Sequence, residues 1–125
     1  MKTIVTTFFM IAMPLACLGQ WETQIIQQPQ YARHLDGYVG IESGGEAPAY
    51  PIPGIRVDEC VDISCKQVLN STISDKTGQF HLKPVGAKST YYLRLTAKNY
   101  NPRFYTVKLS PNAPPKLFLE IAPGT

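Results

Sequence analysis

The feature that most constrains the fold is a strict alternation of apolar and polar residues in two neighbouring segments. Residues 91–97 and 103–109 each place every second side chain on an apolar face, which is the period of a half-buried β-strand. We predict that they form an antiparallel hairpin centred on Tyr100. Three apolar pairs then share one face: Tyr91 with Leu109, Leu93 with Val107, and Leu95 with Tyr105. A slip by one residue would carry every apolar side chain to the opposite face, so the register is well specified.

The opposite face of this hairpin carries the residues that could bind a ligand. We expect Tyr92 and Phe104 on the solvent face, flanked by Arg94 and Lys108, and Phe118 projecting from a later strand. Aromatic rings with polar neighbours can stack on sugars or anchor a partner protein. Ordinary cross-strand pairing, or cover by the N-terminal segment, would explain the same residues, because scattered exposed apolar residues are normal.

Five further segments show the same period and are separated by glycine and proline. They are expected around residues 35–41, 55–58, 69–73, 80–82 and 117–121. In the third of these, Leu69, Ser71 and Ile73 mark the strand and Asn70 falls on its outward face. Asn70 also begins an N-glycosylation sequon, a short motif that often occurs by chance. Residues 75–78 are a turn, with Gly78 where a positive φ is needed.

The segments between these strands exclude a helical fold. Residues 42–54 contain several glycines and prolines, so this connection is neither a helix nor a central strand. No segment after residue 19 shows an amphipathic helical stripe. A length of 125 residues supports one domain. The pattern therefore predicts an all-β fold, a seven-stranded antiparallel Greek-key β-sandwich.

The N-terminus predicts export. Lys2 precedes an apolar run of roughly 13 residues, which is too short to cross a bilayer and fits a secretory signal. Cleavage after Gly19 makes residues 1–19 the signal peptide and residues 20–31 a glutamine-rich N-terminal arm. The protein is then secreted or periplasmic. The alternative is a lipoprotein, cleaved before Cys17 and anchored through that residue.

The charge balance argues against several partners. The chain has 12 basic and 9 acidic residues, and the loss of Lys2 with the signal would lower its formal charge from +3 to +2. The charges are scattered, so we expect no nucleic-acid partner. A membrane is expected as a partner only if Cys17 is lipidated.

Two cysteines remain after export, Cys60 and Cys65, separated by four residues. In an oxidising compartment such a pair is a natural disulfide. A metal site would need more ligands, and a catalytic thiol pair is usually two residues apart. A bridge over so short a loop stabilises by only about 2 kcal/mol, so it pins a turn and does not hold the fold together.

Four motifs in order along residues 32–122 resemble the carboxypeptidase regulatory-like domain family. They are Gly37-x-Val39, Pro51-Ile52-Pro53-Gly54-Ile55-x-Val57, Ser74-Asp75-x-x-Gly78-x-Phe80 and Tyr91-x-Leu93-x-Leu95-x-Ala97-x-x-Tyr100. The resemblance implies a transthyretin-like (prealbumin-like) sandwich, grouped with carbohydrate-binding-like folds, and a structural or interaction module. The chain departs from the family at Asn99, where glycine is frequent, and in its loop between Cys60 and Cys65.

Catalytic chemistry has little support in the sequence. The only histidines, His34 and His81, lack the spacing of a zinc site. Residues 42–45 match a serine-nucleophile turn only superficially, because no helix follows. The chain also lacks the Tyr-Arg-Gly-Ser ending of 5-hydroxyisourate hydrolase, an enzyme with the transthyretin-like fold. We predict no catalytic residue, no metal and no cofactor.

The sequence therefore predicts an exported, non-catalytic module with a structural or protein-interaction role at the cell envelope or outside the cell. The partner would be an unidentified protein or glycan, and the arm at residues 20–31 could pair with a partner's sheet edge. The alternative is a carbohydrate-binding module, distinguished by aromatic rings that lie coplanar on one outward face.

Overall fold

A computed structural model describes residues 24–42 and 50–124 of the chain. The predicted signal peptide, the alternative lipidation site Cys17 and residues 43–45 lie outside these ranges. The described residues contain no helix, and therefore none long and apolar enough to span a membrane. They form nine strands: β2 (Gln24–Ile25), β3 (Gln30–Ala32), β4 (Asp36–Ile41), β5 (Arg56–Cys60), β6 (Val68–Ile73), β7 (Gln79–His81), β8 (Thr90–Thr96), β9 (Arg103–Leu109) and β10 (Leu117–Ile121).

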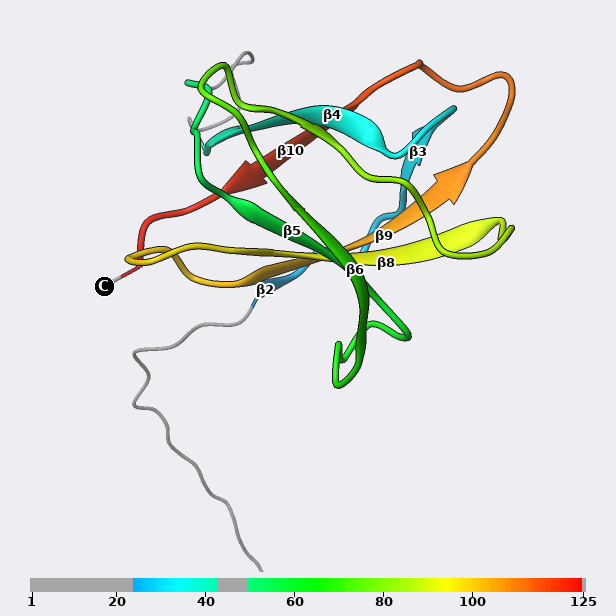
Figure 1. Cartoon of the computed structure of the whole chain (residues 1–125), viewed down its shortest axis with the longest axis horizontal. Helices are drawn as coiled ribbons and strands as arrows, with labels where there is room; N and C mark the ends of the chain where they lie inside the picture. The colour runs from blue at the N-terminus through cyan, green and yellow to red at the C-terminus, as the bar shows by residue number, and fades with distance from the viewer. Residues whose placement is uncertain (1–23, 43–49, 125) are drawn as a thin grey trace, which may run out of the picture.

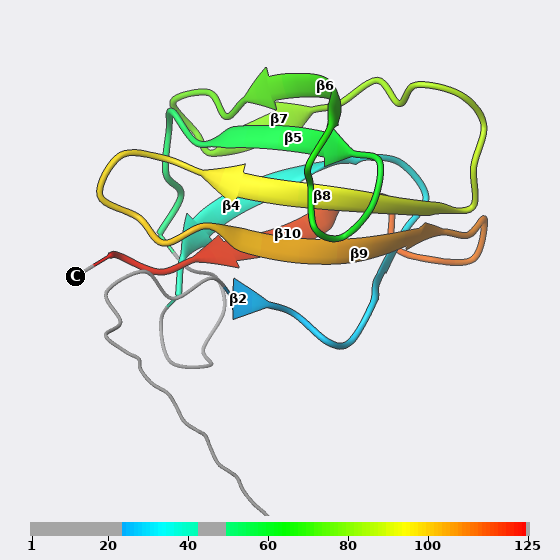
Figure 2. The ribbon, with the colours of Figure 1, turned by 90° about the horizontal axis from the view of Figure 1, so that it is seen from below.

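The strands form two sheets, which face each other as two layers (Figures 1 and 2). The smaller sheet has the order β10-β4-β7, and the larger has the order β2-β9-β8-β5-β6, with β3 also paired to β9. The predicted all-β class is confirmed. The segments predicted as strands coincide with β4 to β10, but β2 and β3 are additional, and three pairings are parallel: β10 with β4, β2 with β9, and β3 with β9.

The additional strands come from the segment expected to be an arm. Gln24 N donates to Pro102 O at 3.2 Å, and Ile26 N donates to Phe104 O at 2.9 Å. In β3, Gln30 lies opposite Val107. The described part of the arm therefore pairs with the outer edge of β9 in the same chain, where the sequence suggested a strand available to a partner. Pairing of this kind closes an edge that would otherwise invite association.

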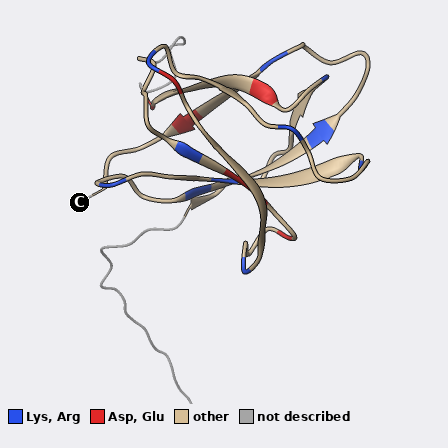
Figure 3. Ribbon diagram, in the orientation of Figure 1, with Lys and Arg blue, Asp and Glu red and all other residues tan. Residues whose placement is uncertain are grey.

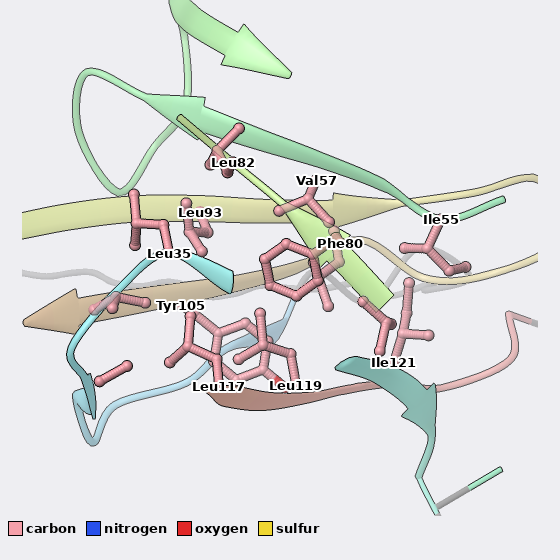
Figure 4. Packing of buried hydrophobic residues seen from close by; sticks show 14 of the residues in the cluster. Leu35, Ile55, Val57, Phe80, Leu82, Leu93, Tyr105, Leu117, Leu119 and Ile121 are labelled. Carbon is pink, nitrogen blue, oxygen red and sulfur yellow. The ribbon is translucent and has the colours of Figure 1, made fainter. Parts of the chain in front are cut away.

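The hydrophobic core fills the space between the two sheets. In Figure 4 the ring of Phe80 lies near the middle of the cluster, between Val57 of the larger sheet and Leu119 of the smaller. Burial of one aliphatic side chain contributes roughly 2 kcal/mol to stability. Most of the inward residues predicted by alternation are buried, and those predicted in residues 69–73 are the exception. The largest fully buried apolar side chains are Leu35, Ile55, Leu82, Leu93, Leu95, Leu117, Leu119 and Ile121.

The predicted register of the β8–β9 hairpin is wrong by two residues. Tyr91 lies opposite Val107, not Leu109, and Leu93 lies opposite Tyr105. Because side chains alternate with a period of two, this shift keeps every residue on its predicted face. It also places Arg103, in place of Tyr105, opposite Leu95.

The turn between the two strands explains the shift. Tyr100 N donates to Ala97 O at 3.1 Å, and Asn99 has a φ of 72°, so the chain reverses one residue earlier than predicted. The residues that follow cannot pair with β8, because they are occupied elsewhere. Tyr100 bridges to Pro123, and Asn101 N donates to Ala122 O.

The predicted facing of residues 69–73 is also wrong. Thr72 lies opposite the buried Val57 and Asn70 opposite the buried Glu59, so Asn70 shares their inward face. Ile73 lies opposite Arg56 and is 62% exposed. Apolar residues occupy both even-numbered and odd-numbered positions in this edge strand, so alternation does not define its inward face. A bulge in the β5–β6 pairing disrupts the alternation further.

The turn predicted at residues 75–78 is confirmed. Gly78 N donates to Asp75 O at 2.9 Å, and the Asp75 carboxylate accepts from the backbone amides of Thr77 and Gln79. Gly78 has a φ of +79°, and a Cβ there would lie 2.9 Å from Val39 O. Glycine is therefore required here both by conformation and by the close approach of β4.

Candidate binding surface

Three of the four predicted binding residues lie together on the outer face of the larger sheet, but they do not form an open surface. Phe104 is only 9% exposed, and it packs with Cys60, Cys65 and the partly buried Tyr92 in a small cluster separate from the main core. The prediction that Phe104 faces solvent is wrong. The strand alternation placed it on the correct face, but it could not show that the disulfide loop folds back over that face.

The loop that covers Phe104 is closed by the predicted disulfide. Cys60 and Cys65 are bonded, with their Cα atoms 4.9 Å apart. The Asp62 carboxylate accepts from Ser64 Oγ at 2.6 Å and from the backbone amides of Ser64 and Cys65 at 3.1 and 3.2 Å. The hydrogen bond from the Ser64 hydroxyl is the largest influence on the pKa of Asp62, and the pKa is lowered. The disulfide and these hydrogen bonds thus hold the loop together. We call this loop, residues 60–65, the cap, because it covers Phe104.

Arg94, the third of these residues, is engaged by a buried carboxylate. Its Nε and Nη2 donate to Asp58 Oδ2 at 3.1 and 2.9 Å, while Ser71 Oγ and Arg56 Nε donate to Asp58 Oδ1 at 2.5 and 2.7 Å. Burial raises the pKa of Asp58, but the hydrogen bonds from Ser71, Arg94 and Arg56 together lower it below its ordinary value. Four hydrogen bonds hold this carboxylate ionised, which ties β5, β6 and β8 together.

Phe118 lies apart from the other three, on the outer face of the smaller sheet. It is 67% exposed and stacks against Tyr38, its neighbour across the parallel pair of β10 and β4. The ring centroids are 5.3 Å apart and the ring planes are 14° from parallel. Lys116 Nζ lies 5.2 Å from the centre of the Tyr38 ring, a cation–π distance. We call Tyr38, Lys116 and Phe118 the aromatic surface.

Polar side chains share this outer face. Asp36 and His81 face each other across β4 and β7, and the His81 ring nitrogen Nδ1 contacts Asp36 Oδ1. The His81 side chain is 77% exposed, as the alternation around Phe80 predicted. Asp36 lies two residues before Tyr38, so the polar pair is roughly 7 Å along the strand from the aromatic surface.

Sequence reasoning identified Phe118 but missed Tyr38 and Lys116. Tyr38 was visible as an outward residue of its strand, and Lys116 directly precedes the last strand. Nothing local shows that β10 pairs with β4, because the two strands are separated by most of the chain.

The charged residues make no strong electrostatic site. Figure 3 shows lysine and arginine beside aspartate and glutamate in the larger sheet and in the described loops, whereas the strands of the smaller sheet carry only Asp36 and Glu120. Within residues 24–42 and 50–124, no group of three or more histidine, cysteine, aspartate or glutamate side chains is arranged to hold a metal ion.

Comparison with models of known protein families finds no match for this chain, and comparison with curated proteins finds none.

Proposed function

We propose that the protein is an exported, non-catalytic binding module that contacts a partner protein at the cell envelope or outside the cell. In this proposal its domain has the carboxypeptidase regulatory-like, transthyretin-like architecture, a seven-stranded Greek-key sandwich to which β2 and β3 are added. The agreement of β4 to β10 with the seven segments predicted by alternation supports this architecture.

The aromatic surface carries the proposal. Phe118 is a large apolar ring that is 67% exposed on a sheet face, with a tyrosine and a lysine beside it. Exposed aromatic residues of this kind are frequent anchors in protein interfaces. The other predicted binding residues support binding less well, because Phe104 is covered and Arg94 is paired with Asp58.

Carbohydrate binding is the second candidate function. The Asp36–His81 pair on the same face supports it, because sugars need hydrogen-bonding groups beside an aromatic ring. The stacking of the rings favours a protein partner instead. Tyr38 and Phe118 cover part of each other, whereas a sugar platform needs ring faces that lie side by side.

Site-specific photo-crosslinking tests the proposal. A photoreactive phenylalanine analogue replaces Phe118 in one variant and Ile73 in a control, which is similarly exposed but lies on the larger sheet. We expect a discrete protein adduct from position 118 that is lost on adding Tyr38→Ala, and none from position 73. The same adduct from both positions, or from neither, contradicts the proposal. Binding on a glycan array that Phe118→Ala removes would favour the second candidate.

An intact mass of the exported protein tests its processing. Cleavage after Gly19 predicts an unmodified chain that begins at Gln20. A mass that begins at Cys17 and carries acyl groups would instead establish the lipoprotein alternative. Detection of the full-length chain alone would contradict export by either route.

A further inference from the structure

A pocket of about 150 Å3 opens at one end of the sandwich, where the turn between β3 and β4 meets the segment after β7. Leu35 and Leu82 form part of its lining, and both are almost fully buried. In Figure 4 these two side chains lie at one end of the core, and Ile55 and Ile121 lie at the other. The pocket therefore lies over the end of the hydrophobic core.

Hydrogen bonds join the segments that line the apolar part of the pocket. Leu82 N donates to Leu35 O at 3.0 Å, which joins the two lining segments directly. The backbone carbonyl of Lys83 accepts from Asn70 Nδ2 at 2.6 Å, which fixes the rim on the side of β6. Leu109, at the end of β9, adds a third aliphatic side chain.

The rim of the pocket is mainly cationic. Arg33 and Lys83 contribute two positive charges, and both histidines of the chain, His34 and His81, line the same pocket. Arg33 Nε donates to Ala113 O at 3.1 Å, which holds the guanidinium at the rim. Among the described residues that line the pocket, Asp36 is the only carboxylate, and it already contacts His81.

We propose that this pocket binds a small organic anion, a carboxylate attached to a short apolar chain. A cationic rim above an aliphatic floor complements a ligand with one charged and one apolar end. The volume corresponds to about five water molecules, at about 30 Å3 each, so the apolar chain is limited to a few carbon atoms. The carboxylate would lie near Arg33 and Lys83, and the chain would lie against the partly exposed side chains of Pro84 and Leu109, beside the buried Leu35 and Leu82.

A titration followed by the backbone amide resonances of the protein tests this proposal. The probe is butyrate, and its uncharged matched control is butyramide. We expect saturable shifts at Leu35 and Leu82 with butyrate, and at least tenfold weaker binding of butyramide. Inorganic phosphate, which has the charge without the apolar chain, should also bind more weakly than butyrate.

Four variants complete the test. Arg33→Gln and Lys83→Gln should each raise the dissociation constant for butyrate at least fivefold. Lys98→Gln is the matched control, because Lys98 lies in the turn at the opposite end of β9, roughly 20 Å away. The absence of saturable shifts, equal binding of butyramide or phosphate, or an equal loss with Lys98→Gln would each overturn the proposal. Phe118→Ala should leave butyrate binding unchanged, which separates this pocket from the aromatic surface.

Discussion

Arg103, on β9 of the larger sheet, donates from Nη2 to the carboxylate of Glu42 at 2.5 Å. Glu42 directly follows β4 of the smaller sheet. The Arg103 side chain is 5% exposed, and it also donates to Glu120 O and to the Gln24 side chain. Burial lowers the pKa of Arg103, but the hydrogen bonds to Glu42 and Tyr105 raise it overall, so the guanidinium stays charged. One cation on β9 thus contacts the smaller sheet at Glu42 and Glu120 and also bonds to β2 of its own sheet.

Replacing Arg103 and replacing Glu42 should lower the stability of the protein by unequal amounts. Arg103→Ala should lower the free energy of unfolding by about 3 kcal/mol, because three segments lose a shared donor. Glu42→Gln should cost only about 1 kcal/mol, since Glu42 is half-exposed and Arg103 keeps its other acceptors. Urea denaturation of both variants measures the difference. Equal losses would show that Arg103 does not act as a shared anchor.

The hydroxyl of Tyr105 pairs with the backbone of Glu120 in β10. It donates to Glu120 O at 2.7 Å and accepts from Glu120 N at 2.9 Å, and burial raises its pKa. Tyr105→Phe would leave both backbone groups without this partner, so we expect a loss of about 2 kcal/mol in urea denaturation. Tyr31→Phe, an exposed control, should change stability by less than about 0.5 kcal/mol. Similar effects of the two changes would contradict this role for Tyr105.

Asp58 should make stability fall in acid. Its folded-state pKa is lowered relative to the unfolded chain, so its stabilising contribution is complete above the unfolded pKa of about 4. The contribution is lost as pH falls from about 5 through the folded pKa. Asp58→Asn should therefore lower stability at pH 7 and reduce the difference in stability between pH 7 and pH 3. An unchanged difference would show that Asp58 is not a source of the acid sensitivity.

Glu59 is a buried carboxylate that is incompletely paired. Its Oε1 accepts from Val85 N at 3.0 Å, whereas Oε2 has no hydrogen-bond partner among the described residues. Glu59→Gln keeps an acceptor for Val85 N and replaces the incompletely paired carboxyl group with an amide. We expect stability at pH 7 to rise by about 1 kcal/mol. Glu59→Ala should instead be destabilising, and a loss of stability with both changes would contradict the argument.

The disulfide should stabilise the cap without being needed for the fold. Replacing Cys60 and Cys65 with serine should lower the free energy of unfolding by about 2 kcal/mol, while the far-ultraviolet circular dichroism stays that of a β-protein. A reducing agent should reproduce the loss in the natural chain and have no effect on the double variant. Loss of all β-structure in the double variant would mean that the cap holds the main core together.

The strand positions and most of their faces could be predicted because alternation is a local property of the chain. Leu93 and Leu95 are inward and Tyr92 outward whatever their partners are, since side chains alternate along any strand. The register of the β8–β9 hairpin could not be predicted from alternation alone. It depends on the turn at Asn99 and on the competition of the C-terminal segment for Tyr100, and neither is visible in the alternation itself.

The candidate sites were less predictable because they also depend on contacts between distant segments of the chain. Phe104 and Phe118 look alike in sequence, each an outward aromatic residue in a strand, yet one is 9% and the other 67% exposed. The difference depends on which loop covers each sheet face. Phe104 is covered by the loop that ends at Cys65, and Cys65 precedes Phe104 by almost 40 residues in the chain.

By itself, the sequence determined the class of the fold, the positions of its main strands and the disulfide partners. Each of these depends on the residue types and spacing within a short segment. Only the tertiary structure decided that Tyr38 stacks on Phe118, that Arg103 contacts Glu42 and that both histidines line one pocket. Those contacts join distant segments, and their geometry follows from how the two sheets pack, which no local pattern encodes.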